Sequence, residues 1–158
     1  MRCLIRICPS VALLLLAISV AFADDKPIAL ELNKFEFKVP ENLKSLFGYE
    51  ESDAKLFFYT NGAATAAIDV PADGEYEIIV KASCAKAQDE FAKFKLSIDG
   101  ELIGKETALT AEEEKEYKLS TKLKKGPHKL SIEFTNDVYK ENEYDRNLFV
   151  HAVSVKKK

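Results

Sequence analysis

The fold of this chain is decided by residues 117–134, which read YKLSTKLKKGPHKLSIEF. Apolar and polar side chains alternate on both sides of the Gly126-Pro127 pair. Successive side chains of a strand point to opposite faces, so this period of two predicts two strands, each with one buried and one solvated face. Glycine and proline interrupt regular structure strongly, and we therefore expect the chain to turn between the two strands.

The same alternation recurs along the chain between turn residues. It is found at residues 28–37, 76–82 and 94–98, and further short runs that predict strands lie at residues 55–59, 63–70, 102–103 and 148–155. Asp99-Gly100 between two such runs predicts a β-hairpin, and the PADG sequence at residues 71–74 predicts a further turn. Residues 41–53 are expected to form a loop with a helical turn at residues 42–46.

Many short strands, with turns about every eight to twelve residues, are typical of a sandwich or a barrel. The regular alternation predicts antiparallel sheets with one solvated face. The chain has 158 residues, which is the length of one domain. We predict an all-β fold, a two-sheet antiparallel β-sandwich of jelly-roll type.

The N-terminus has the pattern of a secretory signal peptide over residues 1–23. Two arginines precede the apolar run VALLLLA at residues 11–17, and an A-x-A cleavage pattern ends at Ala23. This run is shorter than the roughly 20 residues of a membrane span. We expect a mature domain of residues 24–158 that does not insert into a membrane, located outside the cell, in a periplasm or at the cell surface.

The charge balance excludes one class of partner. The chain carries 23 basic and 26 acidic residues. Loss of the first 23 residues would leave 21 basic against 26 acidic residues, a net charge of −5. Nucleic-acid binders are normally basic, so we expect no nucleic-acid partner. Cys84 would be the one remaining cysteine, which predicts a buried small residue without an internal disulfide.

The segment that carries chemistry is the last loop, residues 136–147, which reads NDVYKENEYDRN. Four acids fall within nine residues: Asp137, Glu141, Glu143 and Asp145. A cation or solvent must relieve their mutual repulsion, and oxygen-rich clusters suit calcium. The alternative is a solvated acidic loop balanced by Lys140 and Arg146, and the spacing alone leaves both open.

Two motifs in this region resemble the signature of a known family. Residues 134–139 (FTNDVY) and 145–150 (DRNLFV) resemble the F-x-N-D-x-Y and D-R-N-L-Y-V-D blocks of calcium-dependent xylan-binding carbohydrate-binding modules. The stretch around residues 90–100 is also similar to such domains, so the likeness covers most of residues 55–155. Two departures are His151 in place of the final aspartate and the absence of tryptophan.

The resemblance implies a calcium ion at the loop end of a β-sandwich, where the ion coordinates vicinal sugar hydroxyls. The metal ligands that it implies are the carboxylates of Asp137 and Asp145 and the backbone carbonyl of Tyr144.

The same resemblance implies four further residues on the ligand-binding side: Asn136, Tyr139, Arg146 and Asn147. Arg146 is expected to pair with an acid or brace the loop, and Asn147 to tie backbone groups together. Tyr139, Tyr144 and Tyr49 are candidates for stacking on a sugar ring in place of tryptophan.

From these observations we predict a secreted, non-catalytic module that binds xylan or a related polysaccharide through calcium. A monomer is expected, with another exported protein as an additional partner. The alternative is a calcium-stabilised structural or adhesion domain that binds protein rather than sugar. No catalytic motif is visible, so no enzymatic activity is expected.

Overall fold

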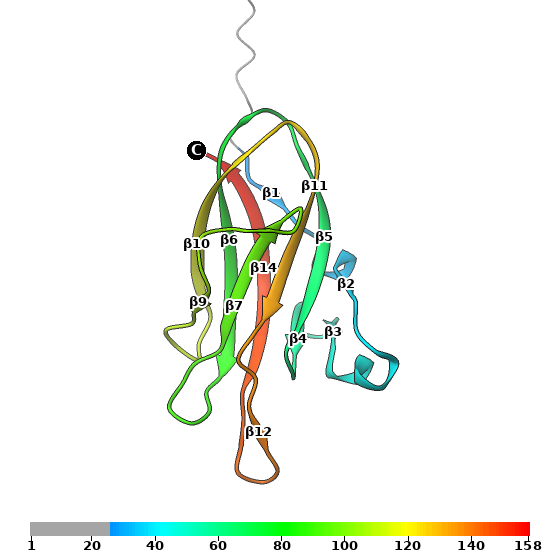
Figure 1. The fold of residues 1–158 in the computed structure, drawn as a ribbon, viewed down its shortest axis with the longest axis vertical. Coiled ribbons are helices and arrows are strands. Elements are labelled where there is room, and N and C mark those ends of the chain that lie inside the picture. The colour runs from blue at the N-terminus through cyan, green and yellow to red at the C-terminus, as the bar shows by residue number, and fades with distance from the viewer. Residues whose placement is uncertain (1–25) are drawn as a thin grey trace, which may run out of the picture.

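The computed structural model describes residues 26–158 as a β-sandwich (Figure 1). Residues 1–25, with the predicted signal peptide, lie outside the described part. Sheet A contains β1 (Ile28–Ala29), β3 (Phe47–Glu50), β4 (Lys55–Phe58), β6 (Gly74–Ala85), β10 (Lys115–Leu123) and β14 (Asn147–Lys157). Sheet B contains β2 (Glu36–Phe37), β5 (Gly62–Val70), β7 (Lys93–Ile98), β8 (Glu101–Leu102), β9 (Thr107–Ala108) and β11 (Gly126–Phe134).

The strand order confirms the predicted two-sheet antiparallel sandwich of jelly-roll type. Sheet A runs β10-β6-β14-β4-β3, with β1 paired to β14. Sheet B runs β2-β5-β11-β7-β8, with β9 paired to β7. A separate two-stranded hairpin consists of β12 (Tyr139–Lys140) and β13 (Tyr144–Asp145) and projects from one end of the sandwich (Figure 1).

The alternation in the sequence produces the core. On β11 the buried side chains are Leu130, Ile132 and Phe134, and the intervening residues face outward. Sheet A contributes the matching positions from its central strands, including Tyr76, Ile78, Val80, Leu148 and Val150. Apolar burial of this kind contributes about 25 cal/mol per Å² removed from water, so the facing rows hold the two sheets together. Cys84 is buried, as expected.

One of the predicted turns joins two strands of the same sheet, and two others join strands of different sheets. Asp99 (φ 54°) and Gly100 (φ 87°) join β7 to β8 as the expected hairpin, with both residues in the left-handed region that a type I′ turn needs. The turns at residues 71–74 and 124–127 instead carry the chain between the sheets. Asp73 ties these two turns together by accepting from the backbone N–H of Lys125 at 2.8 Å.

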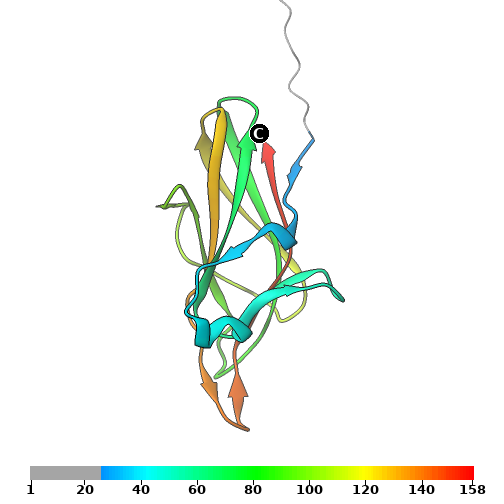
Figure 2. The ribbon, with the colours of Figure 1, turned by 90° about the vertical axis from the view of Figure 1, so that its right-hand side faces the viewer.

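The N-terminal segment crosses the open side of the sandwich (Figure 2). It pairs with sheet A through β1, passes through the 3₁₀ helix η1 (Leu32–Lys34), and pairs with sheet B through β2. The expected helical turn is the 3₁₀ helix η2 (Glu41–Leu46). The expectation of a loop at residues 47–50 was wrong, because Phe47 is buried in the core and holds β3 against β4. Within residues 26–158, no helical segment combines the length and the apolar character that a membrane crossing requires.

Candidate functional site

The four acids of the last loop separate into two groups. Glu141 and Glu143 lie at the exposed tip of the β12–β13 hairpin, where Asn142 (φ 59°) turns the chain and Lys140 pairs with Glu143. Asp137 lies just before the hairpin, and Asp145 is the last residue of β13. Among residues 26–158, no three His, Cys, Asp or Glu side chains gather at one point, so any metal here would depend on two carboxylates and on other oxygens.

Asp137 and Asp145 line one hollow of about 450 Å³. The other residues that line it are Leu46, Tyr59, Thr60 and Tyr139. Tyr139 is 64% exposed, so its ring stands open to solvent beside the carboxylates. The structure thus brings together three of the seven residues singled out from the sequence.

Asp137 carries an unsatisfied oxygen. Its Oδ1 atom is buried and accepts no hydrogen bond, although buried polar atoms normally have a partner. Burial raises the pKa of this carboxyl, a hydrogen bond with Thr60 opposes the shift, and the negative charge of Asp145 adds to it. The backbone N–H of Asp137 donates to Asn61 Oδ1 at 2.7 Å, which fixes the residue in place.

Asn147 orients the second carboxylate. Its Nδ2 atom donates to Asp145 Oδ2 at 3.0 Å. The Oδ1 atom of Asn147 is buried and, like that of Asp137, has no hydrogen-bond donor. Two unsatisfied buried oxygens therefore lie on residues beside or within the Asp137–Asp145 site.

Arg146 braces the loop from behind. The residue is 3% exposed, and its side chain donates to the backbone carbonyls of Glu90, Asn136 and Ala87. It also forms an ion pair with the Glu90 carboxylate at 3.3 Å. These contacts join the last loop to residues 87–90, and Arg146 does not line the hollow.

Asn136 has a similar position. Its Oδ1 atom accepts from the backbone N–H of Lys93 at 2.7 Å, and its Nδ2 atom donates to the carbonyl of Phe91 at 3.0 Å. The side chain therefore anchors the end of β11 to the start of β7. Tyr144 is half-buried on β13 opposite Lys140, and it does not line the hollow.

His151 also lies away from the hollow. It occupies a bulge of β14, where Val150 pairs with Ala82 and Ala152 pairs with Lys81, so His151 has no partner on β6. Bulges re-aim a side chain, and here the imidazole turns toward Ser83 on the outer face of sheet A. The residue that replaces the aspartate of the family pattern is therefore outside the Asp137–Asp145 site.

Three residues of the hollow were missed from the sequence: Leu46, Tyr59 and Thr60. Leu46 ends η2, and the other two follow β4 directly. No spacing links them to the last loop, because β14 pairs with β4 only through the tertiary fold. The only local sign of this part of the hollow was Tyr59, a tyrosine at the end of the apolar run 55–59.

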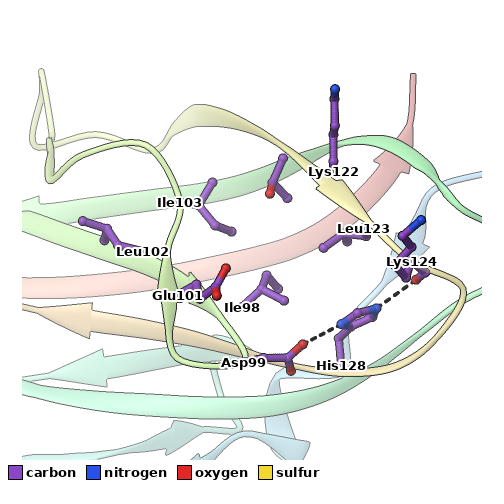
Figure 3. Close-up of a pocket in the computed structure, with 10 residues that line it drawn as sticks. Ile98, Asp99, Glu101, Leu102, Ile103, Lys122, Leu123, Lys124 and His128 are labelled. Carbon is purple, nitrogen blue, oxygen red and sulfur yellow. Dashed lines mark hydrogen bonds and ion pairs between the residues drawn. The ribbon is translucent and has the colours of Figure 1, made fainter.

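A second hollow lies at the other end of the sandwich, between the β7–β8 turn and the end of β10 (Figure 3). His128 is its one histidine, and both ring nitrogens are already hydrogen-bonded. Nδ1 contacts Asp99 Oδ2 at 2.7 Å, and Nε2 contacts the Lys124 carbonyl at 2.8 Å. Both contacts hold the imidazole in place, which is consistent with a structural role for His128.

The donor set of the first hollow fits a calcium ion. Calcium takes oxygen ligands from carboxylates, carbonyls, amides and water. Asp137 and Asp145 would balance its charge, and the buried Oδ1 atom of Asp137 would gain the partner that it lacks. Thr60, which carries a hydroxyl, lines the same hollow.

Comparison with known proteins gave one family match. A model of calcium-dependent, xylan-binding carbohydrate-binding modules, family 60, matches residues 77–158. A comparison with curated protein sequences found no match.

Solved structures share the fold at low identity. The CBM36-1 domain of a multidomain xylanase from the hindgut metagenome of Trinervitermes trinervoides has a TM-score of 0.62 at 11% identity and covers 84% of this chain and 98% of its own. The carbohydrate-binding module CBM36 in complex with calcium and xylotriose has a TM-score of 0.61 at 15% identity, with coverages of 83% and 99%. A family 35 module from Clostridium thermocellum has a TM-score of 0.59 at 11% identity, with coverages of 84% and 99%.

Proposed function

The chain belongs to the calcium-dependent xylan-binding carbohydrate-binding modules of family 60, and from this membership we propose that it binds a xylan-like polysaccharide through a calcium ion at Asp137 and Asp145. The match contains both motifs of the last loop and so confirms the resemblance noted in the sequence. Members of the family are binding modules, and no catalytic role is proposed.

One observation carries the metal part of this proposal. A half-buried carboxylate with an unpartnered oxygen is costly to keep in a calcium-free protein, because an unsatisfied buried polar atom loses its interaction with water. Asp137 is in this state, and Asp145 lies in the same hollow. A bound cation would relieve both the missing partner and the repulsion between the two acids.

The chain's own residues would divide the work of binding. Asp137 and Asp145 hold the ion, Asn147 orients Asp145, and Arg146 keeps the loop against residues 87–90. When bound, the calcium ion offers coordination positions that vicinal sugar hydroxyls can take in place of water. The exposed ring of Tyr139 is placed to pack against the apolar face of the same sugar.

The location and the partners are also proposals. We propose export of the chain with cleavage after Ala23, followed by action outside the cell beside another exported protein. The motive is the signal pattern of residues 1–23. Mass spectrometry of the exported protein tests this, because a form that retains Met1 would exclude cleavage after Ala23.

A titration of xylohexaose tests the binding function. The parent protein, Asp145→Asn and the control Glu141→Gln are measured by calorimetry with calcium and with a chelator. Glu141 is an exposed acid on the same hairpin and does not line the hollow. We expect binding only with calcium, its loss in Asp145→Asn, and no change in the control. Equal binding by the parent and Asp145→Asn would overturn the proposal. Calcium stabilisation without sugar binding would favour the structural alternative.

A further inference from the structure

The outer face of sheet A carries an aromatic cluster that begins at the hollow. Phe57 on β4 and Phe149 on β14 point outward, because their neighbours Leu56, Phe58, Leu148 and Val150 are buried between the sheets. Tyr59 follows β4 directly. Its ring centroid lies 4.8 Å from that of Phe57 and 6.2 Å from that of Phe149. Tyr59 also lines the hollow with Asp137 and Asp145, so the cluster and the hollow are continuous.

A glycine lets these rings pack closely on the sheet. Gly48 lies opposite Phe57 across β3 and β4. A Cβ atom on Gly48 would lie 2.8 Å from the Cε1 and Cζ atoms of Phe57, which is closer than atoms can approach. The Phe57 ring therefore fills the place of the missing side chain and supports Tyr59, which remains 39% exposed.

Polar side chains that are hydrogen-bonded to one another lie next to the aromatic cluster, on the β6 side of Phe149. Ser83 lies directly opposite Phe149 on the neighbouring strand β6. The Ser83 hydroxyl is 2.8 Å from His151 Nε2, and His151 Nδ1 is 3.3 Å from Glu114 Oε1. Burial lowers the pKa of His151 and so favours the neutral ring. Because a carboxylate can only accept, the neutral ring would donate from Nδ1 to Glu114 and accept at Nε2 from Ser83. This arrangement leaves the lone pairs of the Ser83 oxygen available to an incoming hydroxyl.

The charges of this face are paired within the protein. Lys55 lies 5.2 Å from the centre of the Phe149 ring and forms ion pairs with Glu50 and Asp53. On the other side, Lys81 is paired with Glu114. Both lysines already have acid partners. The outer face of sheet A therefore suits a neutral ligand better than an anionic one.

We propose that Tyr59, Phe57, Phe149, Ser83, His151 and Lys55, the sheet A patch, form a second contact region for the same polysaccharide chain. The patch takes neutral pyranose units beyond the one held at the hollow: the Tyr59 ring stacks on one of them, and Ser83 and Lys55 bond to hydroxyls further along. Phe149 follows Asn147 by two residues, roughly 7 Å along the strand, so a chain of a few sugar units reaches both regions. This inference rests on the proposed function for the first sugar and adds a neutral, extended chain as the ligand.

The dependence of affinity on chain length tests the patch. Xylobiose and xylohexaose are titrated in calcium against the parent, Phe149→Thr, Ser83→Ala and Asp145→Asn. Threonine is a good strand residue, so Phe149→Thr keeps β14 while it removes the ring. Leu102→Thr is the matched control, since Leu102 is an exposed apolar strand residue on sheet B.

We expect Phe149→Thr to bind xylohexaose about tenfold more weakly and xylobiose as the parent does, because one aromatic contact of up to about 1.5 kcal/mol is lost. Ser83→Ala should show the same pattern with a smaller change, and Leu102→Thr none. In NMR spectra, the backbone amides of Ser83 and His151 should shift with xylohexaose and not with xylobiose.

The failures of the two proposals are distinguishable. If Phe149→Thr and Ser83→Ala bind both sugars as the parent does, the patch is not a contact region, whereas the calcium site stands as long as Asp145→Asn has lost binding. If Asp145→Asn keeps its affinity for xylobiose, the calcium-bridged site is wrong. Tighter binding of a xylan chain bearing uronic acids than of a neutral one would overturn the assignment of a neutral ligand.

Discussion

Asn147 donates its side-chain amide to Asp145 Oδ2 at 3.0 Å, across a single intervening residue of the chain. The intervening residue is Arg146, whose side chain points into the protein, so the two neighbours of Arg146 face the same side. Asn147 is the first residue of β14, which pairs with both β4 and β6. Asn147, at the start of the central strand of sheet A, thus helps to orient a carboxylate that belongs to the hairpin strand β13.

Asn147→Ala should weaken calcium binding while both carboxylates remain. A residue that orients a metal ligand typically contributes 10- to 100-fold to metal affinity, and we expect a loss of about tenfold. Calorimetric titration of calcium measures it, with Glu141→Ala as the control on the same hairpin. Unchanged affinity in Asn147→Ala would show that Asp145 needs no orientation.

Asp137→Asn should stabilise the calcium-free protein. The folded-state pKa of Asp137 is raised, so its ionised form opposes folding above the unfolded pKa, and asparagine cannot ionise. The melting temperature at pH 7 in chelator should therefore rise.

In the parent, calcium at a hundredfold excess over its Kd should add about 2.7 kcal/mol of stability. Asp137→Asn should lack that gain, and an equal gain in both proteins would count against Asp137 as a ligand.

Arg146→Met should lower the free energy of unfolding by about 3 kcal/mol, because three backbone carbonyls and the Glu90 carboxylate lose a buried donor. Urea denaturation measures the change. Lys140→Met is the control, since Lys140 is exposed and pairs only with Glu143 in the described contacts. A loss no larger than in the control would mean that water can replace the guanidinium.

The His128–Asp99 pair should make stability depend on pH. The hydrogen bond to Asp99 raises the pKa of His128, so this stabilisation is fully present below about pH 6.5 and is lost as the pH rises through the raised folded-state pKa. The same hydrogen bond lowers the pKa of Asp99. The stability that the ionised Asp99 contributes is therefore lost as the pH falls through its lowered folded-state pKa. Urea midpoints of the parent and His128→Gln between pH 5.5 and pH 8.5 measure the His128 contribution. The difference between the two proteins should shrink from pH 5.5 to pH 8.5, and a constant difference would contradict the prediction.

The sandwich was predictable because its core follows a period of two. Residues such as Leu130, Ile132 and Phe134 are buried one by one as the pattern requires. The short β3 was not predictable, since Phe47 and Gly48 form too brief a run to show a period. The assignment of strands to sheets was also beyond the pattern. The turn at Gly126-Pro127 gives no local sign that it joins strands of different sheets.

Only the part of the candidate site that lies in residues 137–145 was predictable from the sequence. Asp137, Tyr139 and Asp145 lie within nine residues, and a local motif could identify them. Tyr59 reaches them from 78 residues before Asp137 through the pairing of β4 with β14, which no local spacing encodes. Arg146 and Asn136 could be named, but their attachment to the carbonyls of residues 87–91 requires the folded backbone.

The path of β14 has a mechanical consequence. This strand starts beside Asp145 and runs to Lys157, and β1 lies antiparallel along its far end, so both ends of the described chain emerge opposite the hairpin (Figure 1). A pulling force between the hairpin and the C-terminal end of β14 would run along the strand. The ladder hydrogen bonds of antiparallel strands are perpendicular to that direction, so they would be loaded together in shear rather than peeled apart one at a time. The fold thus places its strongest resistance along the line that joins the hairpin to the C-terminal end of β14.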